Sequence, residues 1–455
     1  MNTNFYIASR LAKVRHTDSE LIELKTFFSN IQKDIHAQYD FFNYCKTWKL
    51  APWMYSQLKS LELFSTLSQE VQIVFADFAE KIYTENTRRL EEASMFLAEF
   101  QKEHIDVVIL KGNAFLSEIY GNIGYKKMND FDMLIHLKDW GKVQKIYADL
   151  HYIPLGFGWS GEKEEVAKFS HTGLSFISPN YSCITGTQWG LKSPTSKYTV
   201  NIHDVWNKTE PLMFQNLNLK QLSPEYNLLH LILHMGTYKC GIRDCMDVYN
   251  LLLVKSEFNE DLFIQICKES NATDKAYFTL SLSQLCCNSI NQSLIDRLKP
   301  TKNSFIIRRL HARIKMFEKT GDMQLSYNDY FHDVEMIVFY FSLFHTFHKK
   351  IALYLKLVQS LFFVEKKAAY TLSDLTNDAT MWQKFKARIL APYYVFSLIG
   401  EEIGVGITIL LFVKMFFDSL ISIKNYAFKK MSYFQFLKKE GIDSKEIISV
   451  VKGIQ

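Results

Sequence analysis

The sequence is poor in proline and has no cysteine pattern typical of a metal or disulfide site. Only 8 of the 455 residues are proline, which argues against long loops or disordered segments as a major part of the chain. The seven cysteines form no C-x-x-C pair, and no histidines accompany them at the spacing of a zinc site. We therefore expect reduced and mostly buried thiols.

Long apolar runs are also missing. No run reaches the roughly 20 uninterrupted apolar residues that a membrane-spanning helix needs, and residues 1–16 lack the apolar core of a signal peptide. We therefore expect a cytoplasmic protein without a transmembrane span. Two apolar peaks, 334–361 and 389–420, are expected to form buried helices. The lysines after the second peak also fit a peripheral contact with a membrane surface (Lys424, Lys429, Lys430 and Lys438).

The chain has no strong charge of either sign, and its length exceeds that of one ordinary domain. A formal net charge of +5 permits contact with nucleic acid or an anionic membrane without pointing to either. A chain of 455 residues is expected to contain more than one compact part. Apolar residues recur every three to four positions before residue 100 and again after residue 221, as in amphipathic helices. We therefore predict a helical region at 1–100, a core at 101–220 and a helical domain at 221–455.

One stretch of the predicted core carries recognisable chemistry. An apolar run at 107–110 ends at Lys111-Gly112, a segment compatible with a helix follows at 113–120, and a later strand begins Asp130-Phe131-Asp132. Residues two apart on a strand point to the same face, so the two carboxylates are expected to lie side by side. Like charges in a half-buried place repel unless a cation neutralises them. The stretch therefore predicts a Mg²⁺ or Mn²⁺ site formed by Asp130 and Asp132.

The D-x-D tripeptide is common, and one aspartate could instead cap a turn while the other is solvated. The upstream strand, Lys-Gly and helix unit favours the metal site. Gly112 allows close backbone approach, and a helix N-terminus beside Lys111 suits a phosphate group.

The motifs in this stretch resemble those of a known protein family. Leu110-Lys111-Gly112, Tyr120-Gly121 and the segment 130–135 are similar to the motif of the "uncharacterised nucleotidyltransferase" family, a branch of the polymerase-β-like nucleotidyltransferase superfamily. The resemblance implies an α+β fold, with a small mixed sheet between helical regions. It also implies transfer of a nucleoside monophosphate from a nucleoside triphosphate to an acceptor hydroxyl, with release of pyrophosphate. Lys126 stands where the family usually has an arginine, four residues before the first aspartate.

The family's third metal carboxylate is replaced in this sequence. The resemblance places Asn201 at that position and His203 at the family's histidine. We predict a strand over 198–206, with Asn201 and His203 on one face and Asp204 on the other. Asn201 then contributes an oxygen to the metals without charge, and His203 orients or deprotonates the acceptor hydroxyl. A bulge that turned Asp204 inward would make it the third metal ligand instead.

The downstream helices carry further matches to the family. Ser223-Pro224 is a good helix start, and His230 and His234 fall on one face of the predicted helix. We expect core or phosphate-facing histidines in preference to a metal pair. By the resemblance, His234, Arg243 and Asp247 build or brace the nucleotide pocket.

Three functional hypotheses remain open, and the third of them, an enzyme that adds nucleotides to the 3′ end of RNA, is allowed by the positive net charge without support from an RNA-binding motif. The first is an active, metal-dependent nucleotidyltransferase. The second, favoured by Asn201, is a catalytically inactive nucleotide-binding or scaffold protein of the same fold. The sequence does not identify the base of the nucleotide, nor does it show whether a sugar, a peptide, a protein or RNA accepts the nucleotide.

Overall fold

A computed structural model describes residues 2–156, 167–235, 241–301, 304–321, 346–375, 378–427 and 431–453, together with 330, 334, 336–338 and 340–341. The chain forms two compact units, each built from two segments. The first contains Met1–Leu134 and Asn201–Gln324, and the second contains Ile135–Val200 and Leu325–Gln455. The three consecutive regions expected from the sequence stay a prediction.

The first unit combines a mixed sheet with many helices. Its strands include β1 (Val108–Ile109), β2 (Phe131–Leu134), β6 (Thr209–Phe214) and β7 (Leu217–Leu222). They lie in the order β2-β1-β7-β6, where only the β1–β7 pair is parallel. Between β1 and β2 come the helix α6 (Gly112–Phe115) and the π-helical turn η2 (Leu116–Tyr120). Mixed strand directions beside segregated helices confirm the predicted α+β class.

Most helices of this unit come before β1 or after β7, and α9 lies between β2 and β6. Those before β1 are α1 (Thr3–Leu11), α2 (Asp18–Ile31), α3 (Ile35–Thr47), α4 (Ala51–Ser60), the short η1 (Phe64–Thr66) and α5 (Gln69–Lys102). Those after β2 are α9 (Ile202–Asn207), α10 (Pro224–His234), α11 (Ile242–Val254), α12 (Glu260–Glu269), α13 (Thr273–Cys287), α14 (Gln292–Arg297) and α15 (Phe305–Thr320). The predicted start of α10 is confirmed, because the Ser223 side chain accepts a hydrogen bond from Tyr226 N.

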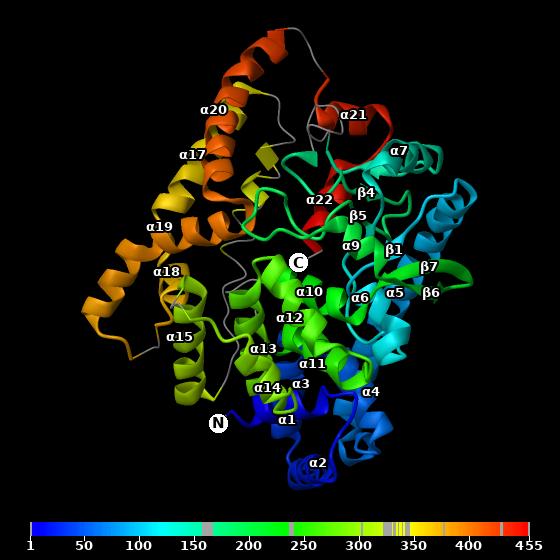
Figure 1. The fold of residues 1–455 in the computed structure, drawn as a ribbon, viewed down its shortest axis with the longest axis vertical. Helices are drawn as coiled ribbons and strands as arrows, with labels where there is room; N and C mark the ends of the chain where they lie inside the picture. The colour runs from blue at the N-terminus through cyan, green and yellow to red at the C-terminus, as the bar shows by residue number, and fades with distance from the viewer. Residues whose placement is uncertain are drawn as a thin grey trace. The chain divides into compact units, whose positions relative to one another are not determined.

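The long helix α5 packs against the sheet (Figure 1). The ring of Phe96 lies 5.7 Å from that of Phe131 on β2, and Phe131 lies 5.6 Å from Phe214 on β6. All three rings are buried. Aromatic side chains bury large apolar areas, so this cluster fixes the β2 strand that carries the two aspartates.

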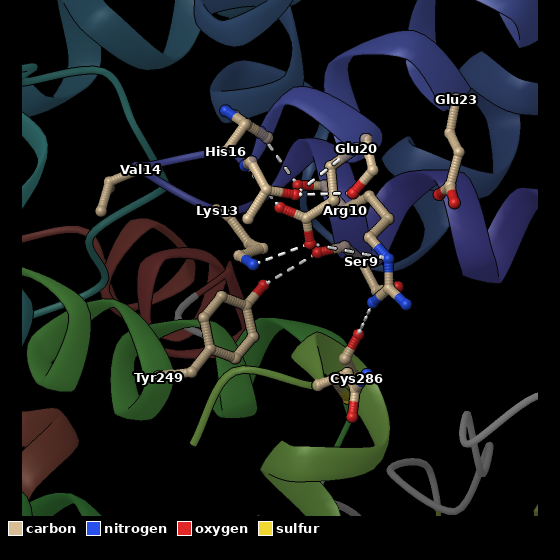
Figure 2. Close-up of polar contacts among 12 residues, drawn as sticks. Ser9, Arg10, Lys13, Val14, His16, Glu20, Glu23, Tyr249 and Cys286 are labelled. Carbon is tan, nitrogen blue, oxygen red and sulfur yellow. Dashed lines mark hydrogen bonds and ion pairs between the residues drawn. The ribbon is translucent and has the colours of Figure 1, made fainter. Parts of the chain in front are cut away.

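The helix α1 is joined to α11 and α13 by polar contacts, and an ion pair joins Lys13, just after its end, to α2 (Figure 2). Tyr249 Oη donates to Ser9 O at 3.4 Å, and Arg10 Nη1 donates to Cys286 O at 3.1 Å. Lys13 Nζ lies 2.8 Å from Glu20 Oε1. Breaking such a buried pair is costly because the remaining charge stays desolvated. The N-terminal helices therefore help to hold α11, the helix that carries Asp247.

The second unit contains short strands and two groups of helices. Its elements are η3 (Leu137–Asp139), α7 (Trp140–Asp149), β3 (Ile153–Pro154), β4 (Phe176–Ile177), β5 (Thr185–Gln188), α17 (Phe347–Phe362), α18 (Lys366–Leu372), α19 (Met381–Ile403), α20 (Val405–Ala427), α21 (Tyr433–Lys439) and α22 (Ser444–Gly453). A buried cluster of Ile153, Ile177, Tyr433, Leu437 and Ile447 joins β3 and β4 to the last two helices.

The prediction that the apolar peaks form buried helices is wrong for α20. Within the described residues, one helix is long and apolar enough to cross a membrane by length and composition, through its stretch Gly406–Ile423. Only 17% of that stretch is buried, because most of its large apolar side chains point outward. For the thiols the prediction is confirmed, since the six described cysteines are buried and free. Cys240 lies outside the described residues.

Candidate active site

Asp130 and Asp132 lie at the start of β2, as the D-x-D pattern predicts. Asp130 directly precedes the strand and is half-buried, whereas Asp132 is within the strand and only 6% exposed. Leu110 N donates to Asp132 O at 3.1 Å and so extends the pairing of β1 with β2. The residue after Leu110 is thereby held next to the carboxylates.

That residue is Lys111, and its ammonium group pairs with Asp132. Lys111 Nζ lies 2.8 Å from Asp132 Oδ2. Burial by itself would lower the pKa of Lys111, but the charges of Asp132 and Asp130 outweigh burial and raise this pKa. The lysine therefore stays charged beside the two acids.

One lysine does not fully compensate the two carboxylates. Burial raises the pKa of Asp130 to about 6, and the neighbouring charge of Asp132 acts in the same direction. The charges of Lys111 and Arg89 oppose this shift but do not cancel it. An additional cation at this position would favour the ionised form of Asp130.

The backbone of Lys111 is strained. Its φ of 53° and ψ of −137° lie in a region that glycine usually occupies. Such a conformation costs on the order of 1–3 kcal/mol and persists where the surrounding structure fixes it. Here it brings the chain from β1 directly into α6 and aims the Lys111 side chain at Asp132.

Gly112 is required by packing as well as by its place at the helix start. A Cβ atom on this residue would lie 2.9 Å from Tyr125 Oη and 3.0 Å from Lys126 Cε. The Tyr125 hydroxyl donates to Gly112 O at 3.2 Å, and its ring stacks on Tyr120 with centroids 4.0 Å apart. Any larger residue at position 112 would displace this stacked pair.

Lys126 and Asp247 form a second buried ion pair next to this packing. Lys126 Nζ contacts Asp247 Oδ2, and Tyr120 Oη donates to Asp247 Oδ1 at 2.7 Å. Asn250 Nδ2 lies 3.4 Å from the same tyrosine oxygen. Asp247, predicted to build or brace the pocket, is therefore in contact with Lys126.

The other two predicted pocket residues are less closely joined to this group. Arg243, on α11, is half-buried, and its charge opposes the burial and the Asp247 charge that raise the pKa of Tyr125. It therefore lies near the same phenol. His234 is the exposed last residue of α10, whereas His230 is buried. Of the two histidines, His230 therefore lies in the core and His234 does not.

Two residues of α5 were not predicted for this site. Asn86 is fully buried, and its amide donates to Ile123 O and Lys126 O while its oxygen accepts from Met128 N. Arg89 Nη1 donates to Asn86 Oδ1 at 3.2 Å. Although Arg89 stands in a charged stretch of the sequence, it is only 9% exposed. In the sequence, Arg89 falls at helical spacing between Asn86 and Ala93 on the buried stripe of α5, and this spacing indicates a buried position.

The strand predicted over 198–206 is wrong, because residues 202–207 form α9. Asn201 is the N-cap of this helix, and its side-chain oxygen accepts from His203 N at 3.1 Å. Asparagine is among the strongest N-cap residues, and here capping overrides the apparent alternation. Asn201 Nδ2 donates to Asp204 Oδ2 at 2.7 Å, so these two side chains meet on one side of the helix. His203 is 80% exposed, with its Nδ1 3.8 Å from Asp204 Oδ1.

A match to a known protein family covers the region that contains these residues. Residues 37–288, more than half of the chain, match the family described as uncharacterised nucleotidyltransferase. The chain belongs to this family. The match runs from α3 to the end of α13 and confirms the resemblance predicted from the Lys-Gly and D-x-D motifs. No curated protein matches the chain. Membership in a nucleotidyltransferase family supports nucleotidyl transfer as the general activity.

The donor set of this nucleotidyltransferase-family site suits one Mg²⁺ or Mn²⁺ ion better than two. Among the described residues, no group of three or more His, Cys, Asp and Glu side chains is placed to hold a metal. Mg²⁺ commonly takes one or two protein carboxylates and completes its shell with phosphate oxygens and water. Asp130 and Asp132 provide that number. Next to them, Asn113 Nδ2 donates to Asp130 O at 3.4 Å, while the buried Asn113 Oδ1 accepts no hydrogen bond from the residues that the structure describes.

Proposed function

We propose that this protein is a metal-dependent nucleotidyltransferase that moves a nucleoside monophosphate from a nucleoside triphosphate to an acceptor hydroxyl. The main support is the under-compensated carboxylate pair Asp130 and Asp132 beside a charged lysine at the start of α6. Asn113 Oδ1 in the same place, which has no hydrogen-bond partner among the described residues, also fits a site completed by a ligand.

The reaction forms a bond between the acceptor oxygen and the α-phosphorus. The bond from that phosphorus to the oxygen bridging to the β-phosphate breaks, pyrophosphate leaves, and the acceptor gives up its proton. Asp130 and Asp132 hold a Mg²⁺ or Mn²⁺ ion, which when bound neutralises phosphate charge and acts as a Lewis acid. Lys111, which is charged and half-buried, adds a fixed positive charge where phosphates gather.

The remaining residues act by position. Gly112 leaves room for Tyr125 and Lys126, and the Lys126–Asp247 pair fixes the turn that leads into β2. Arg243 and His234 are proposed to meet the nucleotide from the α10–α11 side. His203 stays a predicted acceptor-facing base, and the acceptor itself is a hydroxyl compound, either a sugar, a peptide, a protein or RNA.

The direct test is pyrophosphate release with each nucleoside triphosphate and Mg²⁺ or Mn²⁺. Asp130→Ala should lower the rate at least about a hundredfold while the fold stays intact, because it removes a ligand of the ion that is proposed to stabilise charge on the reacting phosphates. Asp106→Ala is a control, since this exposed aspartate next to β1 pairs with Lys220 outside the site. Equal rates in wild type and Asp130→Ala would reject the proposal.

A second candidate is a nucleotide-binding protein without turnover. The observation that favours it is the role of Asn201 as a helix cap bonded to Asp204, in place of a third metal carboxylate. Nucleotide binding that requires Mg²⁺ and Asp130, without pyrophosphate release for any triphosphate and acceptor class, would support this candidate.

A further inference from the structure

The helix α20 has its polar and apolar faces reversed relative to a helix of a soluble domain. Large apolar side chains on one face are 40–62% exposed: Ile409, Leu410, Val413, Phe416, Phe417, Leu420, Ile421 and Ile423. The hydroxyl residues Thr408, Ser419 and Ser422 on another face are no more than 4% exposed. A surface helix of a soluble domain normally places its apolar face inward and its polar face outward.

The buried hydroxyl groups of α20 donate to backbone carbonyls of the helix or of Gly404, the residue just before it. Thr408 Oγ1 donates to Gly404 O at 2.9 Å, Ser419 Oγ donates to Met415 O at 2.9 Å, and Ser422 Oγ donates to Ser419 O. These residues are small, and α20 packs against α17 and α19 (Figure 1). Small hydroxyl residues between helices and large apolar residues outside are typical of helices in contact with lipid.

The first half of α19 adds a second exposed stripe. Met381, Trp382, Phe385, Ile389 and Tyr393 recur at helical spacing and are 55–81% exposed. Lys384, Lys386 and Arg388 lie between them, and α19 has no acidic residue before Glu401. Aromatic and basic residues on one amphipathic helix suit the boundary between lipid headgroups and acyl chains.

The basic residues of these helices favour a lipid surface over a second copy of the chain as the partner that covers the exposed apolar faces of α19 and α20. The helix α17 also has no acidic residue and carries Lys349, Lys350 and Lys356. Two copies meeting through these helices would bring cations together, which is unfavourable. An anionic bilayer surface instead attracts them.

The charges within α20 decide between lying on a membrane and crossing it. Lys414 and Asp418 form an ion pair at 2.7 Å in the middle of the apolar stretch, and their side chains are 43% and 32% exposed. Charged groups at the centre of a bilayer are costly. We propose that α19 and α20 form a membrane-docking surface that inserts its exposed apolar side chains into the interface of an anionic bilayer.

The test is flotation of the full chain with vesicles of phosphatidylcholine alone or with added phosphatidylglycerol. Wild type should float with the anionic vesicles. The variant Leu410→Gln/Val413→Gln/Phe417→Gln should bind on the order of tenfold more weakly for each inserted side chain. The matched control Ile22→Gln/Ile73→Gln/Met95→Gln changes residues that are similarly exposed in the first unit and should bind like wild type.

A charge variant and a release assay complete the test. Lys384→Gln/Lys386→Gln/Arg388→Gln should reduce the preference for anionic vesicles on the order of fivefold for each charge. Release by alkaline carbonate is expected for a helix that lies in the interface, and retention would overturn that geometry. Failure of wild type to float, or self-association abolished by the apolar variant without vesicle binding, would overturn the membrane partner. Pyrophosphate release is measured without vesicles, so the outcome is independent of the proposed function.

Discussion

Lys111 pairs with Asp132 at 2.8 Å through a backbone conformation that lysine rarely adopts. The same residue therefore provides the charge beside the acids and bears the strain of the turn between β1 and α6. A strained residue that persists at a charged site is a functional candidate.

Two substitutions separate the charge of Lys111 from its strain. Lys111→Ala removes the ammonium and keeps a Cβ in the left-handed region, whereas Lys111→Gly removes both. We expect both variants to lose nucleotide binding, and Lys111→Gly to be more stable than Lys111→Ala by about 1 kcal/mol. Urea unfolding measures the difference. Equal stability of the two variants would show that the backbone at this position is relaxed.

The raised pKa of Asp130 predicts a pH dependence of stability. A carboxyl group with a pKa of about 6 in the folded protein holds its proton more tightly there than in the unfolded chain. Stability from this group is therefore present below its ordinary pKa of about 4 and is lost as the pH rises through about 6, by on the order of 2 kcal/mol. Asp130→Asn should remove that loss.

Thermal unfolding in EDTA from about pH 4 to about pH 7 provides the measurement. The melting temperature of Asp130→Asn should rise relative to wild type across this range. Mg²⁺ at the upper end should stabilise wild type and not the variant, because the ion compensates the ionised carboxylate. Parallel pH profiles for the two proteins would contradict the assignment of this titration to Asp130.

Gly112 and Tyr125 should be coupled. Gly112→Ala places a Cβ 2.9 Å from Tyr125 Oη, so we expect a loss of about 1–3 kcal/mol from overpacking. Tyr125→Phe removes that oxygen, and the double variant should therefore lose less than the sum of the two single variants. A double-mutant cycle on unfolding free energy tests this. Additive losses would mean that Lys126 Cε, at 3.0 Å, is the contact that matters.

The sequence predicts local elements better than contacts between distant segments. The helix that begins after Ser223 and the D-x-D strand follow from periodicity and from short motifs. The pairing of Lys126 with Asp247 joins residues 121 positions apart, and only the family resemblance suggested that both belong to one pocket. The contact that holds the buried Arg89 does not follow from the sequence, because a charged residue on a buried stripe requires a specific partner, here Asn86, that no pattern reveals.

The prediction of a strand over 198–206 is wrong for a related reason, namely that a side-chain contact decides the local structure. Alternating apolar and polar residues over a few positions fit either a strand or a short helix. The hydrogen bonds of Asn201 to His203 N and Asp204 decide for the helix. A single side-chain cap therefore changes which residues share a face.

That cap makes Asn201→Asp an informative change. Aspartate caps helices as well as asparagine does, so the bond to His203 N should persist. The amide that donates to Asp204 Oδ2 would become a second carboxylate facing the first. Without a divalent ion we expect a loss of about 1 kcal/mol from their repulsion, and Mg²⁺ or Mn²⁺ should restore this stability. Asp204→Asn in the same background removes the facing pair and should abolish the metal effect.

The rate of pyrophosphate release by the Asn201→Asp variant then tests whether a carboxylate at position 201 contributes to the reaction. If the N-terminus of α9 contributes to the metals of the reaction, the added charge should raise the rate of pyrophosphate release and lower the Mg²⁺ concentration that it needs. Both changes should require an intact Asp130, because the proposed ion that contacts the triphosphate would be held by Asp130 and Asp132. An increase in metal-dependent stability with an unchanged rate would place Asn201 and Asp204 outside the reacting centre.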